Sequence, residues 1–367
     1  MSNSNSRGAD SRFWLAYFLV VTIVCGFANS ARAQSPELAM RDFSSGQIKK
    51  GVRSIGFGGD GATWGNYGLV WQDANTAVLD YGNTHYTNGN DFNFQAVGAT
   101  SPSLWHDLAI YAIAMQQGTN DVKFLAKAQG LGPTAVPMVG KGNDEAVFVK
   151  VAMPIAYGLS AGVLLSHETS QFDATSAGGQ SVKYETDWRP SGGFGVAWQS
   201  GDKKWLLGFR ALYNNDFERR IDSAGVAEGL AQSQEYRLGA SYQVWKGGLI
   251  DVGATRIEKW NAIAGTHTVS YNPNLGIEQK LTDSFTVRIG LDETSPTAGF
   301  TYRFSPFKLD VSYVHDMAKA RVGDLFGTTS DSILATLTFD FAKETASPSS
   351  KYAATGGVEQ PAAKILR

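Results

Sequence analysis

Three features of the sequence predict an all-β fold: a transmembrane, up-and-down, antiparallel β-barrel of about 14 strands with an N-terminal plug in its lumen. Apolar and polar residues alternate over many short segments, and no apolar run long enough for a membrane-spanning helix follows an N-terminal export signal. The expected connections between these segments are alternately short and long. Neighbouring side chains of a strand point to opposite faces, so each alternating segment has one apolar and one polar face. A soluble sandwich shows such alternation too, whereas the export signal and the connections favour an outer-membrane barrel.

The composition agrees with a chain of many strands. The 367 residues include 32 Lys+Arg against 34 Asp+Glu, so the charge balance indicates no nucleic-acid partner. Charged residues make up 18%, with 41 Gly and 11 Pro, which is typical of strands joined by turns and not of a disordered chain.

Residues 1–33 are predicted to be a secretory signal peptide. A basic stretch precedes an apolar core over 13–27, and Ala31-Arg32-Ala33 forms a small-x-small cleavage site. The alternative is a membrane anchor, but the apolar core is shorter than the ~20 residues of a spanning helix. The single cysteine, Cys25, lies within this signal, so the mature chain has no disulfide. No later run approaches a spanning helix, and a membrane role after export therefore requires a barrel.

The segment 332–341 shows the alternation most clearly. Its apolar residues fall at every second position: Ile333, Ala335, Leu337, Phe339 and Phe341. The same period recurs at 205–214, 236–244, 268–281, 285–292, 298–304 and 307–314, and no helical period is of comparable strength. We expect about 14 strands between residues 76 and 341, an even number as in bacterial barrels.

The end of the predicted barrel resembles an assembly signal. Phe341 closes the last strand and looks like the terminal aromatic residue that the barrel-assembly machinery recognises, so this machinery is an expected partner during biogenesis. Residues 342–367, rich in Ala, Ser, Pro, Gly and Lys, are predicted to form a disordered periplasmic tail.

The connections and the aromatic residues also favour a barrel. Short turns are predicted at 200–204, 246–248, 281–284 and 305–307, and longer loops at 118–144, 173–181, 217–232 and 317–330. An up-and-down barrel has such tight turns on one rim and long loops on the other. Aromatic residues gather near the expected strand ends, as an interfacial girdle requires: Trp188, Trp198, Trp205, Trp245, Trp260, Tyr302, Phe304 and Phe307.

Residues 34–75 precede the barrel, do not alternate and are rich in glycine, so we expect them to form a plug in the lumen. The segment Arg53-Ser54-Ile55-Gly56-Phe57-Gly58-Gly59-Asp60-Gly61-Ala62, followed by Asp73-Ala74-Asn75-Thr76-Ala77, resembles the N-terminal hatch of the FadL-type outer-membrane transporters. The resemblance implies a 14-stranded barrel, a hatch in which Gly56, Gly58, Gly59, Gly61 and Asp73 belong to the plug, and passive uptake of long-chain fatty acids or aromatic hydrocarbons. In that family the substrate leaves sideways through a gap in the wall.

Three arginines are candidate substrate-lining residues: Arg210, Arg237 and Arg288 all fall on the polar face of their segments. Their guanidinium groups could bind a carboxylate head group through paired donors. Alternatively, they pair with inward acids, because charges buried in a lumen need partners. The candidate acids are Asp251, Glu278, Asp292 and Asp310.

The segment 107–117 is apolar on both faces, which a purely polar channel would not favour. One face carries Tyr111, Ile113 and Met115, which we take as candidates for contact with the substrate or with the plug. The expected loop 118–144 is apolar for an exposed loop, so it is either a surface site that captures apolar molecules or a loop folded over the barrel mouth.

We expect no catalytic residue, no metal site and no cofactor. The spacing Gly56-x-Gly58-x-x-Gly61 lacks the strand and helix of a dinucleotide site, and Ser160 in Gly158-Leu159-Ser160-Ala161-Gly162 lies within a strand pattern, on its lumen-facing side. The histidines show no metal-binding spacing: His85, His106, His167, His267 and His315.

The sequence thus predicts a protein of the bacterial outer membrane, surrounded by outer-membrane lipid, that takes up a hydrophobic small-molecule substrate. Two other functions stay open: a water-filled porin, and a structural or adhesive barrel whose loops bind partners. The glycine-rich segment 34–75 and the apolar segment 107–117 favour the uptake channel.

Overall fold

In a computed structural model of the protein, the described residues are 66–67, 75–105, 108–126, 136–187, 189–222, 224–263, 265–317, 327 and 329–341. Every regular element among them is a β-strand, and no described helix is long and apolar enough to cross a membrane. The expected signal peptide, most of the expected plug, including Gly56, Gly58, Gly59, Gly61 and Asp73, and the expected tail lie outside these residues, as does Trp188.

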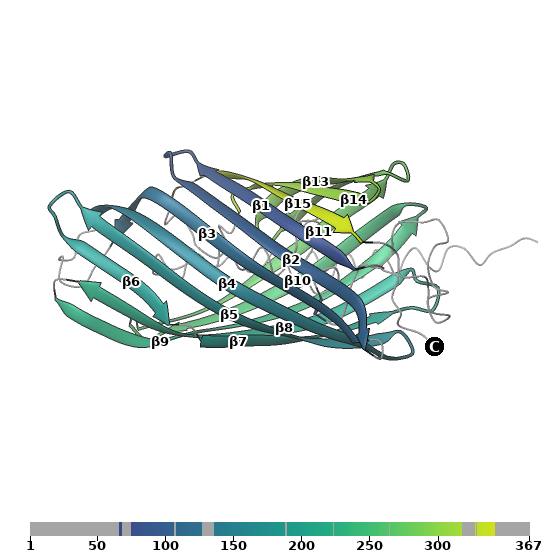
Figure 1. Cartoon of the computed structure of the whole chain (residues 1–367), viewed down its shortest axis with the longest axis horizontal. Coiled ribbons are helices and arrows are strands. Elements are labelled where there is room, and N and C mark those ends of the chain that lie inside the picture. Colours follow the sequence, from purple (N-terminus) through teal and green to yellow (C-terminus); the bar gives the residue numbers. More distant parts are fainter. Residues whose placement is uncertain are drawn as a thin grey trace, which may run out of the picture.

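The strands follow one another along the chain as antiparallel neighbours (Figure 1). The first eight are β1 (Thr76–Tyr86), β2 (Asp91–Trp105), β3 (Leu108–Ala126), β4 (Val136–Ala156), β5 (Leu159–Ser176), β6 (Ser181–Asp187), β7 (Arg189–Gln199) and β8 (Trp205–Asp222). The remaining seven are β9 (Gly225–Trp245), β10 (Gly248–Asn261), β11 (Thr266–Lys280), β12 (Phe285–Asp292), β13 (Ser295–Phe304), β14 (Phe307–His315) and β15 (Ser330–Asp340).

The sheet closes into a barrel because the first and last strands pair: Thr76 lies opposite Asp340, and Tyr86 lies opposite Ser330. Strands β6 and β7 both lie between β5 and β8, one above the other, and count as one interrupted strand. The barrel therefore has 14 strands, and this prediction is confirmed. Each described strand thus pairs with a neighbour on both sides over at least part of its length, and such pairing is the condition for a sheet to cross lipid.

Every connection on one rim of the barrel is short, whereas the other rim carries both short and long connections. One rim carries the first strand's start, the last strand's end and the short turns at 200–204, 246–247, 281–284 and 305–306, as predicted. The other rim carries the longer connections 127–135 and 316–329. In outer-membrane barrels short turns are periplasmic and long loops extracellular, which orients this barrel.

The prediction of loops at 118–144, 173–181 and 217–232 is wrong over most of their length, because the strands continue through them and leave, for example, only 177–180 between β5 and β6. Strands β3 and β4 leave only 127–135 between them, and β8 and β9 leave only 223–224. Strands β4 and β9 have 21 residues each, whereas β12 has 8 and β14 has 9. Since a membrane crossing takes about 9–11 residues, β4 and β9 project about ten residues beyond the lipid. The outward residues of a strand segment that projects into water need not be apolar. Such a segment therefore lacks the alternation that identifies a strand, and its sequence resembles that of a loop.

The outer surface of the barrel is apolar, as the alternation predicts. Leu238, Leu165, Ile289 and Ile333 are each more than half exposed on the outside, whereas the residues between them on each strand are more buried. Near the periplasmic rim the aromatic side chains contact one another: Trp205 with Tyr242, Tyr302 with Phe304, Phe304 with Phe307, Phe307 with Phe339, and Phe339 with Phe341. This belt is the expected interfacial girdle.

Candidate functional site: the lumen and its mouth

One sector of the lumen wall is apolar. It is formed mainly by the inward residues of β2 to β6: Phe92, Phe94, Ala96, Ile113, Met115, Val122, Phe124, Met138, Ala146, Phe148, Leu164, Phe172, Ala174, Val182 and Tyr184. Tyr111 packs against this cluster, and Val314 and Leu334 extend it to β14 and β15. The structure thus places Tyr111, Ile113 and Met115 together on the lumen side of β3. Aromatic rings give such a wall a large apolar area in fixed geometry.

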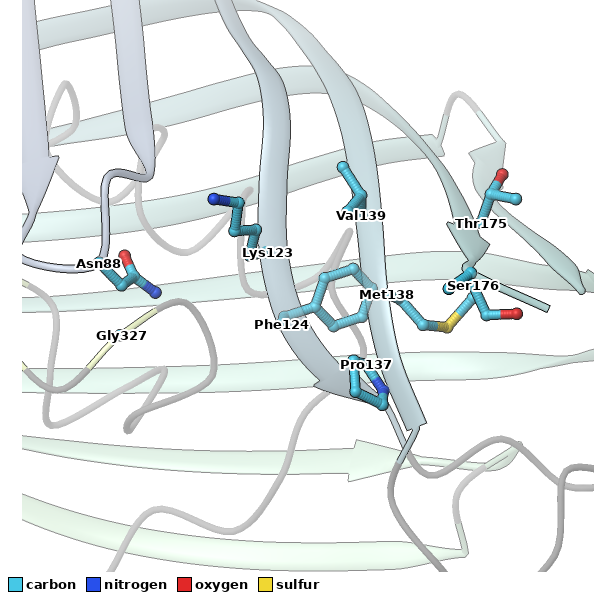
Figure 2. A pocket seen from close by; sticks show the side chains of 10 residues that line it. Asn88, Lys123, Phe124, Pro137, Met138, Val139, Thr175, Ser176 and Gly327 are labelled. Carbon is cyan, nitrogen blue, oxygen red and sulfur yellow. The ribbon is translucent and has the colours of Figure 1, made fainter. Parts of the chain in front are cut away.

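The apolar sector leads up to a cavity of about 720 Å³ at the extracellular mouth. Figure 2 shows Phe124, Pro137 and Met138 on one side of it, at the tips of β3 and β4, with Asn88 and Gly327 on the opposite side. Phe124 also packs edge-on against Phe172, with ring centroids 5.5 Å apart. The cavity is the size of a typical small-molecule pocket and is lined mostly by apolar atoms. It lies where the sequence predicted a capture site, although strand tips and not a loop provide most of its lining.

The second sector of the wall is polar and carries Arg210 and Arg237. These two lie directly opposite each other on β8 and β9. Glu235 Oε1 accepts hydrogen bonds from Arg210 Nη2 at 3.0 Å and from Arg237 Nε at 2.5 Å, and Glu293 Oε1 lies 3.5 Å from Arg237 Nη2. All four side chains are buried, so two positive charges are balanced by two negative charges within the wall.

Arg288 forms a second balanced group. Its Nε lies 3.2 Å from Glu278 Oε2 on β11, and its Nη2 lies 3.2 Å from Asp310 Oδ1 on β14. Lys308 Nζ lies 3.3 Å from the other oxygen of Asp310. Of the two roles left open for the three arginines, pairing with inward acids is the one seen for all of them. Of the predicted acids, Glu278 and Asp310 form these pairs, whereas Asp251 and Asp292 accept hydrogen bonds from Ser241 and Asn274.

Two residues of the segment before β1, Asn66 and Tyr67, dock against this wall from the inside. Asn66 Nδ2 donates hydrogen bonds to the carbonyl oxygens of Val196 and Phe209, each at 3.0 Å. The Tyr67 ring lies beneath the Arg210 guanidinium, with 4.9 Å between the guanidinium carbon and the ring centroid, a cation–π contact. The segment 34–75 therefore lies inside the barrel at Asn66 and Tyr67.

Three glycines make room for this docking: Gly162, Gly193 and Gly195. A Cβ on Gly195 would lie 2.5 Å from Asn66 Oδ1, and one on Gly193 would lie 2.8 Å from Tyr67 Cε2. A Cβ on Gly162 would overlap the Tyr67 carbonyl. Glycine is thus required where the backbone of the docked segment approaches the strands. We call these three residues the glycine notch.

Ser160 and three of the histidines make hydrogen-bond contacts within the barrel. Ser160 is buried on the lumen side of β5 and its hydroxyl lies 3.5 Å from the Ala197 carbonyl oxygen. His85, His267 and His315 lie on the exposed side near the extracellular ends, within hydrogen-bond reach of Asp91, Glu258 and Asp331. In the part of the chain that the structure describes, no group of three His, Cys, Asp or Glu is arranged to hold a metal ion.

A solved FadL homologue from Pseudomonas aeruginosa superposes on this barrel with a TM-score of 0.50, over 80% of this chain and 98% of its own, at 13% sequence identity. The chain has the FadL-type barrel fold. The Pseudomonas putida toluene transporter TodX and the monoaromatic hydrocarbon channel CymD are also similar, with TM-scores of 0.47 and 0.48 and identities of 10% and 12%. Each covers 79% of this chain and 97% of its own. No protein-family model and no curated protein matches the sequence.

The FadL-type fold, with its closed wall and apolar exterior, is that of a bacterial outer-membrane protein. Within it, sequence reasoning missed Glu235, Glu293 and the Asn66–Tyr67 docking point. Glu235 could have been found, because it stands two residues before Arg237 and so shares its face of the strand. Glu293 and Asn66 could not, because they lie outside regular alternation and meet their partners only through barrel closure.

Proposed function

We propose that the protein is a passive outer-membrane channel that takes up hydrophobic small molecules. The observation that carries this proposal is the continuity of the mouth cavity with the apolar sector of the lumen. Phe124 and Met138 belong to both, so an apolar molecule held at the mouth stays in contact with apolar side chains as it moves inward. A wall of this kind favours an apolar permeant over hydrated ions.

The two sectors of the lumen have different roles in this proposal. Tyr111, Ile113 and Met115 contact the permeating molecule on its way past β3. Arg210, Arg237 and Arg288 fix the opposite wall through their ion pairs, and Arg210 also anchors the docked segment through the Tyr67 ring. Such buried pairs are costly to form in apolar surroundings, and retaining them suits a wall that must hold one shape around a cavity.

A pair of matched substitutions on β4 tests the proposal. Met138→Gln places a polar amide in the mouth cavity, whereas Met153→Gln places the same amide on the outer surface, where Met153 is 52% exposed. Transfer of an unpaired amide to apolar surroundings costs ~1–3 kcal/mol, so we expect Met138→Gln to weaken binding of an apolar fluorescent probe about fivefold or more. Met153→Gln should leave binding unchanged.

The measurement is titration of the purified barrel in lipid nanodiscs, corrected with empty nanodiscs, together with single-channel recording in planar bilayers. Steady ion conductance with no saturable probe binding would contradict the proposal and indicate a water-filled porin. If the protein shows neither ion conductance nor probe binding, the remaining function is a structural or adhesive barrel.

A further inference from the structure

A band of polar side chains crosses the apolar sector of the lumen. It runs from strand to strand at one level: Gln117 on β3, Asp144 on β4, Ser170 on β5, Thr186 on β6 and Glu218 on β8. Each is at most 5% exposed. Apolar residues lie on both sides of the band along the strands, with Phe124 and Met138 toward the mouth and Met115 and Phe148 toward the periplasm. In the proposed function, a permeant that follows the apolar sector from the mouth crosses this band.

Most of the band is hydrogen-bonded within the wall. Ser170 Oγ donates to Asp144 Oδ1 at 2.9 Å, the backbone N–H of Ser170 donates to Thr186 Oγ1 at 2.8 Å, and Asn261 Nδ2 donates to Glu218 Oε2 at 2.7 Å. These bonds hold Asp144 in place beside Gln117, its direct neighbour across β3 and β4.

Gln117 is different from the rest of the band. It is 1% exposed, and among the described residues neither its amide nitrogen nor its amide oxygen has a hydrogen-bond partner. Buried polar side chains in proteins are paired in the large majority of cases, and an unpaired one carries the full cost of its desolvation. An unpaired amide in apolar surroundings is therefore a candidate partner for a polar group of a bound molecule.

We propose that Gln117, with Asp144 beside it, forms a subsite that binds the hydroxyl group of an otherwise apolar permeant. A hydroxyl both donates and accepts, so it can accept from the amide nitrogen of Gln117 while donating to the Gln117 amide oxygen or the Asp144 carboxylate. This inference rests on the proposed uptake function and names the substrate class within it: neutral alcohols or phenols with an apolar body.

The same geometry disfavours the two neighbouring chemical classes. A hydrocarbon without a polar group passes the band while leaving Gln117 unpaired, so it gains nothing there. A carboxylate can accept from the amide nitrogen of Gln117, but it has no proton to donate to the Gln117 amide oxygen, and the carboxyl group of Asp144 lies next to it. The subsite thus favours a molecule with a hydroxyl group over a hydrocarbon without a polar group and over a carboxylate.

Three naphthalene-based probes test the subsite: naphthalene, 2-naphthol and 2-naphthoate, which share a ring system and differ in the polar group. Affinities are measured by calorimetry with the full-length mature protein in nanodiscs, corrected with empty nanodiscs. We expect the wild-type protein to bind 2-naphthol about three- to tenfold more tightly than naphthalene, the equivalent of one neutral hydrogen bond. Binding of 2-naphthoate should be the weakest.

The test variant is Gln117→Leu, and its matched control is Gln116→Leu. Gln116 directly precedes Gln117 on β3 and points to the outside. Gln117→Leu should abolish the preference for 2-naphthol while keeping naphthalene binding, and Gln116→Leu should keep the preference. Asp144→Asn should strengthen binding of 2-naphthoate relative to naphthalene. Removal of an unpaired buried amide does not weaken folding, so loss of the barrel is not an expected result of Gln117→Leu.

An unchanged preference for 2-naphthol in Gln117→Leu, or equal binding of 2-naphthol and naphthalene by the wild type, overturns the subsite and leaves the uptake function standing. Failure of the wild type to bind any of the three probes contradicts the uptake function itself, and the subsite with it.

Discussion

Arg210 and Arg237 face each other directly across β8 and β9, and a single oxygen of Glu235 accepts hydrogen bonds from both. Like charges at directly opposite positions of a sheet destabilise it, and here the pair is also removed from water. The carboxylate between the two guanidinium groups makes the arrangement stable. The docking of Tyr67 under Arg210 depends on it as well, because Glu235 orients the guanidinium over the ring.

Removal of the Glu235 charge should destabilise the barrel strongly. In Glu235→Gln the two buried arginines lose their shared counter-charge, and breaking a buried ion pair in this way typically costs ~3–5 kcal/mol. The control is Glu228→Gln, which removes one of the acidic partners of Arg219 in a pair that is 41% exposed on each side and should cost less than ~1 kcal/mol. Urea unfolding in lipid vesicles measures both. Equal destabilisation by the two variants would contradict the role assigned to Glu235.

The glycine notch should control how the segment before β1 sits in the lumen. Gly195→Ala puts a Cβ 2.5 Å from Asn66 Oδ1, too close for any contact, so we expect Asn66 and Tyr67 to leave their docking position. If the segment 34–75 is the plug that the sequence predicts, ion conductance in planar bilayers then rises. Gly118→Ala is the matched control, since a Cβ there has no neighbour within 4 Å. Conductance equal to that of the wild type in Gly195→Ala would contradict the plug.

Two arginine substitutions on the outward face of β9 can show which part of this strand lies in the lipid bilayer. Leu238 and Val226 are similarly exposed, at 65% and 61%, but Leu238 lies in the apolar belt and Val226 near the extracellular tip. Leu238→Arg should destabilise the barrel by ~2–4 kcal/mol and Val226→Arg by ~0–1 kcal/mol, because the cost of a lipid-facing arginine depends on depth. Folding titrations in lipid vesicles measure the difference. Similar costs at both positions would show that the upper part of β9 also lies in lipid.

The strand pattern was predictable where one face of a strand meets lipid. Ile333 and Leu334 illustrate this, because the alternation assigned Ile333 to the outside, and in the structure it is 57% exposed while Leu334 is buried. The pattern failed at 217–232, where β8 and β9 run above the membrane with water outside. There both faces accept polar residues, so a continuous strand pair carries the composition of a loop.

The candidate site was only partly predictable. Sequence reasoning placed Arg210, Arg237 and Arg288 in the lumen and proposed acid partners for them, and two of those acids are among the partners found. It did not find Gln117, although this residue continues the period of Ile113 and Met115 by one more step. Its interest comes from being buried and unpaired, a property of its surroundings and not of its sequence position.

By itself, the sequence determined which side chains face lipid and which face the lumen in the alternating segments, because a period of two fixes direction without reference to any other strand, and it predicted about 14 strands. Only the tertiary structure decided which lumen residues meet. Barrel closure sets the register between strands, and this register brings Arg210 opposite Arg237, divides the lumen into an apolar and a polar sector, and leaves the glycine notch where Asn66 and Tyr67 dock. These contacts join residues from distant parts of the chain, so no local pattern specifies them.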